Sequence, residues 1–240
     1  MNAIRKFLIQ AEDKFWKNRR NGLKPSIFQH DYLHHFGMVK NLKEKIPYMY
    51  SQMKKSRLNV VDIGCGEKPY LKLFAPYTNK YIGVDMDAQG ADITAKAEKL
   101  PFRKSTFDIA VCFQVLEHIY EPEKAISEMK RIVKRGGFVI LTTHGSWMYH
   151  PSPHDYYRWT NEGLTLLFKD FSRVSVKPIL KAPVSLLQLT IIELYSISCR
   201  RFFWKLPSYG VIMFLNLLGR LIWNQGQEHF TTNYFVLARK

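Results

Sequence analysis

Cysteine is scarce in this chain of 240 residues, which has three cysteines, at positions 65, 112 and 199. They lie far apart and form no CxxC pair, so they argue against a disulfide framework or a zinc site and favour a reducing compartment. A Gly-Lys-Ser or Gly-Lys-Thr sequence is also missing, which excludes the phosphate-binding loop of P-loop enzymes.

Acidic residues are few, with 20 Asp and Glu against 36 Lys and Arg, and the formal net charge is +16. Residues 58–181 are nearly balanced in charge, with 17 basic and 14 acidic residues. Residues 1–57 hold 13 basic and 4 acidic residues, and residues 182–240 hold 6 basic and 2 acidic residues. We therefore expect the flanking regions to face an anionic surface, such as a membrane. No signature of an RNA-binding module is visible, so nucleic acid is not favoured as a partner.

Long uncharged apolar runs are absent as well. The first residues contain no signal-peptide core but show a basic amphipathic helix pattern, with apolar side chains at Ile4, Phe7, Leu8, Ala11 and Phe15. Such a helix either lies on an anionic bilayer or packs against the rest of the protein, and the sequence leaves both arrangements open. We expect a cytoplasmic protein, with a peripheral position on the inner membrane face as an option.

Two apolar segments near the end of the chain, 184–199 and 209–223, are predicted to be helices. Neither reaches the roughly 20 uncharged residues that span a bilayer, because Glu193 and Arg220 interrupt them. Their aromatic residues and flanking arginines favour a hairpin at a membrane interface. A homodimer interface and a lid over the acceptor site are the alternatives.

The most informative pattern is a glycine turn after a buried strand. The apolar run 58–63 leads into Gly64-Cys65-Gly66, and a second apolar run, on the next expected strand, ends in Asp85. Glycines let the backbone approach a ligand closely, and an acid at the end of the neighbouring strand accepts the hydroxyls of a ribose. Lys68 and Pro69 stand in place of the third glycine of the dinucleotide fingerprint, so the pattern predicts an adenosine ligand and disfavours NAD.

Strands and helices alternate along the chain, as βαβ units and a parallel sheet require. Thr160 is placed to cap a helix that begins at residue 161. We expect strands at 58–63, 80–84, 107–113, 137–142, 171–179 and 233–238, and helices at 25–56, 122–134 and 161–169.

Six stretches in this order resemble the class I S-adenosylmethionine (SAM) dependent methyltransferases of the type 11 kind: VDIGCG, YIGVDMD, EKLPF, TFDIAV, QVLEHI and IVKRGGFVILTT. The resemblance covers residues 58–178 and the last strand. It implies an α/β, Rossmann-like fold with a mostly parallel seven-stranded sheet, helices on both faces and a short third strand near Asp92. We expect a basic helical N-terminal extension (1–57), a SAM-binding catalytic domain (58–180 and 230–240) and an apolar helical insertion before the last strand (181–229).

A narrower resemblance rests on GCGEKPYLKLF and HPSPHDYYRWT, which look like a bacterial subgroup linked to polysaccharide or other small-molecule biosynthesis. It implies a SAM-dependent methyltransferase acting on a small-molecule or lipid-linked acceptor, such as a hydroxyl of a glycan intermediate. An RNA methyltransferase and a non-catalytic, membrane-associated protein with this fold are the alternatives. Lys96 favours the non-catalytic alternative to some extent. Most relatives carry a carboxylate at this position that contacts the adenine amine, and a lysine cannot accept that hydrogen bond.

Motif position in the resemblance assigns the cofactor site. The glycine turn is expected to contact the methionine end of SAM. Asp62 is expected to bind the amino group of SAM, and Asp85 is expected to bind its ribose. The full set is Asp62, Gly64, Cys65, Gly66, Asp85, Met86, Glu98, Leu100, Phe113 and Gln114. His118 follows strand 107–113 closely and is a candidate general base, because the unperturbed pKa of histidine is near ~6.5. A structural or substrate-orienting role is the alternative for His118, and Glu117 is expected to stabilise the loop.

The segment 144–160 is the candidate acceptor site, because it leaves the carboxyl end of a central strand, where open α/β sheets bind ligands. Its aromatic and hydrogen-bonding groups suit a sugar or another polar small molecule: His144, His150, His154, Asp155, Tyr156, Tyr157 and Arg158. The alternative is structural, with Asp155 paired to Arg158 and the tyrosines in the core. The histidines here are spaced loosely, as are His30 and His34 earlier, so no metal is expected.

Overall fold

The computed structural model describes residues 23–55, 57–87, 89–151, 153–200, 202–223 and 225–240. The predicted amphipathic helix around Ile4 to Phe15 lies outside these ranges and stays a prediction.

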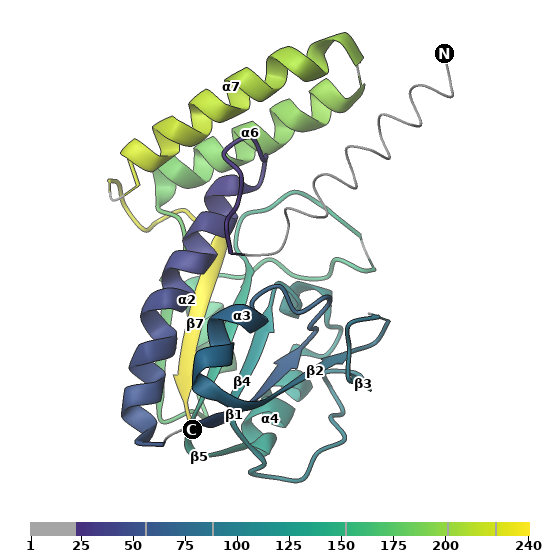
Figure 1. The fold of residues 1–240 in the computed structure, drawn as a ribbon, viewed down its shortest axis with the longest axis vertical. Helices are drawn as coiled ribbons and strands as arrows, with labels where there is room; N and C mark the ends of the chain where they lie inside the picture. The colour runs from purple at the N-terminus through teal and green to yellow at the C-terminus, as the bar shows by residue number, and fades with distance from the viewer. Residues whose placement is uncertain (1–22, 56, 88, 152, 201, 224) are drawn as a thin grey trace.

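A single seven-stranded sheet organises the described residues, in the order β3-β2-β1-β4-β5-β7-β6. β7 runs antiparallel to β5 and β6, and the other pairings are parallel. This confirms the predicted α/β, Rossmann-like class I methyltransferase fold (Figure 1). The strands are β1 (Leu58–Ile63), β2 (Thr78–Asp85), β3 (Ile93–Thr94), β4 (Phe107–Phe113), β5 (Val133–His144), β6 (Arg173–Pro178) and β7 (Asn233–Arg239).

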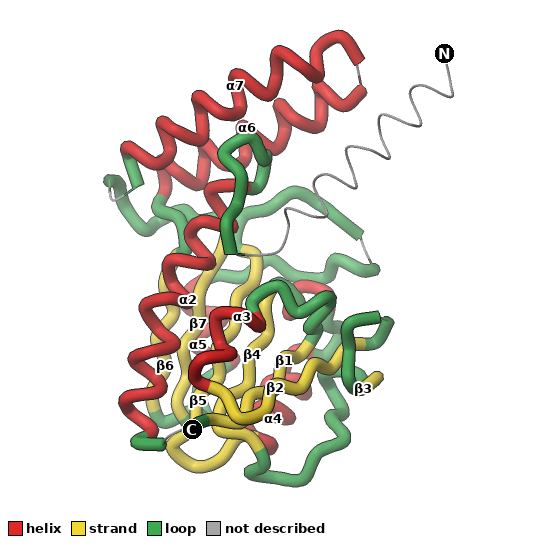
Figure 2. The backbone as a smooth tube through the Cα atoms, in the orientation of Figure 1, coloured by secondary structure: helices red, strands yellow, loops and turns green. Residues whose placement is uncertain are grey.

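Helices cover both faces of the sheet, as Figure 2 shows. They are α2 (Tyr32–Met53), α3 (Leu71–Phe74), α4 (Pro122–Ile132), α5 (Asn161–Leu167), α6 (Ala182–Arg200) and α7 (Phe202–Leu221), with 3-10 turns η1 (Ala75–Tyr77) and η2 (Leu116–His118). Successive residues of a strand point to opposite faces, so Val60 joins the core under α2 and Val61 joins the core under α4. Because both faces are covered, most positions of the central strands are apolar.

Three predicted boundaries of α2 and α4 were wrong. α2 begins at Tyr32 rather than at residue 25, because a turn precedes it in which Gln29 accepts from the Ser26 N–H at 2.6 Å. α2 ends at Met53 because Lys54 takes a left-handed conformation with φ of 49°. α4 ends at Ile132 rather than at residue 134.

β5 starts at Val133, four residues earlier than predicted, and therefore includes Gly136. Lys240 helps to extend β5. Gly136 donates to the Lys240 carbonyl at 2.8 Å, and Lys240 Nζ donates to the Val133 carbonyl at 2.7 Å. Pairing with a strand almost one hundred residues away in the chain is invisible to local patterns, which explains the error.

The α6–α7 hairpin projects beyond the end of the sheet and is inserted between β6 and β7 (Figure 1). α7 starts at Phe202, so its predicted start at 209 was wrong, and Pro207 lies inside the helix. Side-chain amides attach the hairpin to the start of α2: Gln188 accepts from His34 N at 3.1 Å, and Asn216 donates to the Gln29 carbonyl at 2.9 Å. In the described part of the chain, no helix combines the length and the apolar character needed to cross a membrane.

Candidate functional site

The glycine turn forms where β1 ends. The Gly64 and Cys65 N–H groups both donate to the Val84 carbonyl of β2, at 2.8 and 3.1 Å. Gly64 has φ of +68°, and a Cβ there would lie 2.3 Å from Val115 Cγ2, so glycine is required both by conformation and by space. A Cβ at Gly66 would meet nothing within 4 Å, so the backbone faces open space at this position.

The acid that ends β2 is joined to this turn. Gly66 donates its N–H to Asp85 Oδ2 at 3.0 Å, and Asp87 donates its N–H to Asp85 Oδ1 at 3.1 Å. Each carboxylate oxygen keeps further acceptor capacity, since an ionised carboxylate offers about four lone-pair sites. The neighbouring Met86 side chain is 53% exposed, so it is open to a ligand at this edge.

Asp62 lies one residue before the end of β1 and is buried. Tyr81 of β2 donates its hydroxyl to Asp62 Oδ2 at 2.7 Å. Burial raises the pKa of Asp62 to about 7, although the Tyr81 hydrogen bond acts in the opposite direction. Burial likewise raises the pKa of the Cys65 thiol to about 12, so Cys65 remains a thiol and contributes packing and backbone groups rather than a nucleophile.

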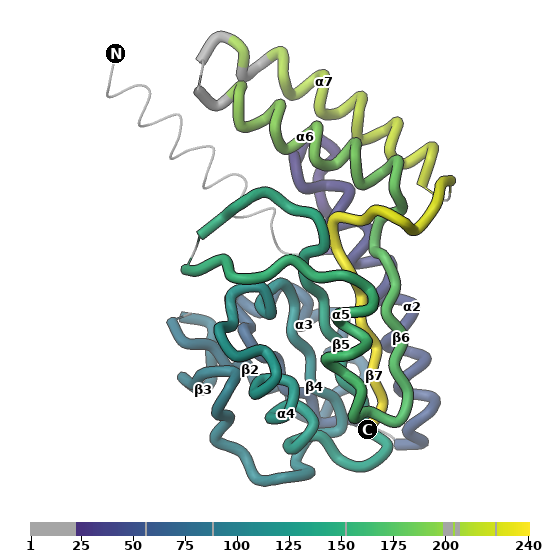
Figure 3. The backbone as a smooth tube through the Cα atoms, turned by 180° about the vertical axis from the view of Figure 1, so that it is seen from behind, coloured from purple at the N-terminus to yellow at the C-terminus, as the bar shows by residue number. Residues whose placement is uncertain are grey.

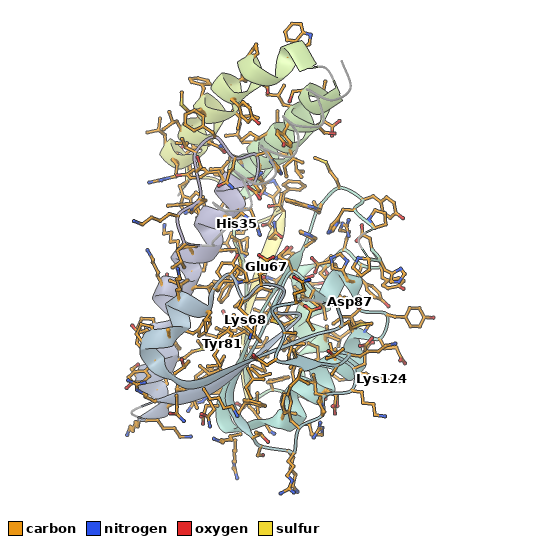
Figure 4. The ribbon with its side chains drawn as sticks, turned by 45° about the vertical axis from the view of Figure 1, so that its right-hand side comes forward. His35, Glu67, Lys68, Tyr81, Asp87 and Lys124 are labelled. Carbon is orange, nitrogen blue, oxygen red and sulfur yellow. The ribbon has the colours of Figure 1, made fainter. Side chains whose placement is uncertain are left out.

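Lys68, which replaces the expected third glycine, crosses from the turn to the loop after β2. Its ammonium pairs with Asp92 Oδ2 at 2.7 Å, and the Gly83 N–H donates to the same oxygen at 2.7 Å. Figure 4 shows Glu67 and Lys68 between His35 of α2 and Tyr81 of β2. Asp92 is therefore engaged with Lys68, and Glu98, a half-buried residue, is the other acid expected near the adenine.

Leu100 is held firmly by its backbone. Its N–H donates to Glu128 Oε2 at 2.8 Å, and its carbonyl accepts from Arg131 Nη2 at 3.0 Å. The Leu100 side chain is buried in the core on the α4 side. It thus forms part of the floor beside β2 and β3 and is not an exposed contact.

Gln114, directly after β4, has a left-handed backbone with φ of 56°, which is uncommon for a residue other than glycine. Its N–H donates to the Thr142 carbonyl at 2.9 Å, and its side-chain amide donates to Thr142 Oγ1 at 2.9 Å. Such conformations persist where the surroundings enforce them and are frequent at ligand sites. Phe113 instead packs edge-on against Tyr70, with ring centroids 5.1 Å apart, on the α2 side of the sheet.

The segment 144–160 crosses above the carboxyl ends of the strands, between the sheet and the α6–α7 hairpin (Figure 3). It is tied to the turn after β4 by its backbone and side chains. Tyr156 donates its N–H to the Glu117 carbonyl at 2.9 Å, and Tyr157 donates its hydroxyl to the Tyr120 carbonyl at 3.0 Å. His118 donates from Nδ1 to the His154 carbonyl, so Nε2 of the neutral ring carries the lone pair.

Within this segment Asp155 and Arg158 pair, as the structural alternative expected. Arg158 Nη2 donates to Asp155 Oδ2 at 2.6 Å, and the Arg158 side chain also donates to the carbonyls of Trp147 and Met148. The Arg158 guanidinium holds the pKa of Asp155 well below its usual range. These two residues stabilise the loop, whereas Tyr156 is exposed at 44% and His154 stacks on it with ring centroids 5.4 Å apart.

His144 lies at the end of β5 and is nearly buried. Its ring stacks on Trp147 with centroids 4.6 Å apart, and its Nδ1 bonds Asn233 Oδ1 at 2.8 Å. Burial lowers the pKa of His144 to about 2, so the ring is neutral. Glu117 lies against it and is fully buried, and burial raises the pKa of this carboxyl.

Sequence reasoning did not single out Tyr81, Thr142, Trp147 or Asn233. Thr142 carried a signal, because a polar residue near the carboxyl end of an otherwise apolar strand faces the ligand edge of an open sheet. Asn233 carried none, because its partner His144 lies 89 residues away in the chain.

Comparison with known proteins agrees with this geometry. The family model described as "Methyltransferase domain" matches residues 61–141. The cofactor of such domains is SAM, and the turn that holds Gly66 is joined to Asp85 by a hydrogen bond. Among curated proteins, the uncharacterized methyltransferase YcgJ of Bacillus subtilis (strain 168) is 30% identical over 101 residues, which is 35% of this chain and 40% of that protein.

Solved structures share the methyltransferase-domain fold. A phosphoethanolamine N-methyltransferase 2 of Haemonchus contortus, in complex with SAM, superposes with a TM-score of 0.55 at 18% identity, over 89% of this chain and 56% of that one. The [4+2]-cyclase SpnF superposes with a TM-score of 0.54 at 16% identity, over 84% and 81% of the two chains. These likenesses show the fold alone. The chain spans half or less of the length of the curated relatives it first matches.

Proposed function

We propose that this protein is a SAM-dependent methyltransferase that acts on a small-molecule or lipid-linked acceptor, with a hydroxyl of a glycan intermediate as the target. The observation that carries the proposal is the direct bond from Gly66 N–H to Asp85 Oδ2, at 3.0 Å. It joins the turn that would receive the methionine end to the acid that would receive the ribose, and these two elements define the cofactor pocket of this fold.

The chain supplies positioning and electrostatics to the reaction. SAM carries a methyl group on a positively charged sulfur, so the group itself is already reactive. Asp85 would hold the ribose hydroxyls, and Asp62 would hold the amino group directly or through water. Gln114 is held rigidly by Thr142 where β4 ends, on the side where the methyl group would lie. Rigid positioning of two reactants can contribute up to about 7–11 kcal/mol to the lowering of the barrier.

On the acceptor side, the segment 144–160 supports a polar ligand with a hydroxyl group. The proton on His118 Nδ1 is held by the His154 carbonyl, which leaves Nε2 as the atom able to take a proton from the acceptor. Tyr156 offers an exposed aromatic face of the kind that sugars stack on. The same segment lies over the strand ends and would keep water from the reacting atoms (Figure 3).

The α6–α7 hairpin supports a lipid-linked acceptor. It exposes a row of large apolar side chains to solvent: Leu186, Ile197, Trp204, Val211, Phe214, Leu217, Leu218 and Leu221. An exposed apolar surface of this kind marks an interaction site, and aromatic residues beside basic ones suit the boundary of an anionic membrane. The hairpin lies on the same side of the sheet as the segment 144–160, so a membrane-bound acceptor would reach the methyl group from that side (Figure 3).

The test is to incubate the purified protein with radiolabelled SAM and a fractionated cell extract. We expect label in the lipid or glycan fraction, and no label with the Asp85→Ala variant. Because a cyclase shares this fold, transfer of the methyl group must be measured directly. Label in RNA would replace the proposed acceptor with RNA, and SAM binding without label in any fraction would favour the non-catalytic alternative.

A further inference from the structure

Three side chains with metal-binding atoms meet at the carboxyl end of β5. Glu117 comes from η2, His144 ends β5, and His150 lies in the loop that follows. Their ligand atoms all lie within 4.8 Å of one another. Glu117 is 0% exposed and His144 is 5% exposed, whereas His150 is partly exposed, so the cluster is buried on one side and open on the other.

The buried carboxylate of Glu117 is only half satisfied. Thr143 donates its hydroxyl to Oε2 at 2.8 Å, but Oε1 makes no hydrogen bond within the described residues. His144 Nε2 lies 3.2 Å from Oε1, at a hydrogen-bonding distance but without the alignment that a hydrogen bond needs. A buried carboxylate oxygen without a partner is destabilising, and a bound ion or water is one physical reason for such a group.

The orientation of the His144 ring explains why Oε1 has no donor. Nδ1 bonds the Asn233 amide oxygen at 2.8 Å, and because that oxygen can only accept, the proton sits on Nδ1. In this tautomer Nε2 carries a lone pair 3.2 Å from Glu117 Oε1 and cannot donate to it, and Asn233 Nδ2 also has no partner among the described residues. His150 Nδ1, the third group, makes no hydrogen bond in the described part of the chain and lies 3.5 Å from Asp155 Oδ2.

We propose that Glu117, His144 and His150 bind a divalent transition-metal ion, and that zinc is the ion this donor set takes. Two His and one Glu, with a fourth position left for water or substrate, is a known arrangement of catalytic zinc. Ligand atoms bound to one tetrahedral zinc at about 2.0–2.2 Å lie about 3.3 Å apart, close to the separation of His144 Nε2 and Glu117 Oε1. His150, on a partly exposed loop, is the ligand able to adjust.

The residues behind the ligands strengthen the assignment. Metal-bound histidines usually donate their second ring N–H to an oxygen, and His144 does so to Asn233. Metal-bound carboxylates are themselves hydrogen-bonded, and Glu117 accepts from Thr143. The open position would bind an oxygen atom of a ligand lying along the segment 144–160. The site does not depend on the proposed methyl transfer, because a metal can be measured without any acceptor.

The experiment measures zinc and cobalt binding by the full chain, with variants chosen to spare the fold. The wild-type protein, loaded with zinc and dialysed, is expected to retain about one zinc per chain by elemental analysis. The His150→Gln variant is expected to bind zinc more than about tenfold less tightly in a competition with a chelator dye. His154→Gln, a histidine of the same segment outside the cluster, is the matched control and is expected to bind zinc as the wild type does.

Cobalt gives a second readout that a merely structural role would not produce. Cobalt(II) in the wild-type protein is expected to show the strong visible absorption of a tetrahedral site, and Glu117→Gln is expected to lose it. Glu117→Gln keeps an oxygen for Thr143, so the fold is preserved. The proposal is overturned if the wild-type protein retains no zinc, which would mean that a proton on Glu117 bridges to His144, or if His150→Gln and His154→Gln bind zinc equally.

Discussion

Tyr81 donates its hydroxyl to the buried Asp62 carboxyl at 2.7 Å, from the strand next to that of Asp62. This bond lies directly under the glycine turn. It provides a strong polar partner for a carboxyl that is 2% exposed. Burial raises the pKa of Tyr81 well above its usual range, so Tyr81 acts as a donor at all ordinary pH values.

The raised pKa of Asp62 predicts how stability depends on pH. The folded pKa is about 7 and the ordinary value is 3.8, so between these values the folded protein binds more protons than the unfolded chain. The contribution of Asp62 to the free energy of unfolding should therefore fall as pH rises from about 4 to about 7, by up to about 1.4 kcal/mol per pH unit, and level off above that range, whereas the lowered pKa values of His34 and His144 act in the opposite direction. Urea unfolding of wild type and Asp62→Asn across this range measures the effect.

Asp62→Asn should remove this slope, because asparagine does not titrate and still accepts from Tyr81. The matched control is Asp87→Asn, which changes an exposed acid nearby and should keep the wild-type slope. Equal slopes in wild type and Asp62→Asn would mean that Asp62 is ionised throughout in the folded protein.

Asp85→Ala should weaken SAM binding by about 10- to 100-fold, because a hydrogen bond to a charged group is worth about 1.5–3 kcal/mol. Calorimetric titration with SAM measures this loss. Asp87→Ala is the matched control, since Asp87 contributes only its backbone N–H to Asp85. Unchanged affinity in Asp85→Ala would remove this residue from the cofactor site.

Alanine at the two turn glycines should separate folding from binding. Gly64→Ala drives a Cβ to 2.3 Å from Val115 and should lower the free energy of unfolding by about 1–3 kcal/mol. Gly66→Ala meets no protein atom within 4 Å and should cost about 1–2 kcal/mol for its left-handed backbone, yet it should lose SAM binding because the new methyl group enters the open space. Urea unfolding measures the stability of both variants, and calorimetry measures their affinity for SAM. Tight SAM binding by Gly66→Ala would place the cofactor elsewhere.

Removing two aromatic residues from the hairpin should weaken binding to lipid. Trp204 is 62% exposed and Phe214 is 63% exposed, so the double change Trp204→Ser and Phe214→Ser should leave the core intact. Sedimentation with vesicles that contain an anionic phospholipid should show affinity lower by about tenfold or more. Tyr120→Ser, which removes an exposed aromatic group outside the hairpin, serves as the control. Equal vesicle binding by all three proteins would favour the dimer or lid alternatives.

Local patterns in the sequence were enough for the framework of this protein. The glycine turn, the acid after β2 and the alternating apolar strands predicted a parallel α/β sheet because each signal depends on neighbours within a few residues. The Thr160 cap is of the same kind, and Thr160 Oγ1 accepts from the Gly163 N–H at 3.0 Å. Motif order then predicted a cofactor site at the carboxyl edge of the sheet, around the glycine turn and Asp85.

The tertiary structure alone decided which polar groups face one another at that edge. Lys68 engages Asp92, Gln114 is held by Thr142, and His144 is oriented by Asn233, across separations of 24, 28 and 89 residues. The contact of Glu117 with His144, and its nearness to His150, likewise arises where η2 meets the end of β5. Periodicity reports which face of an element is buried, whereas these partners are set by how the strand ends and returning loops converge, which only the folded chain determines.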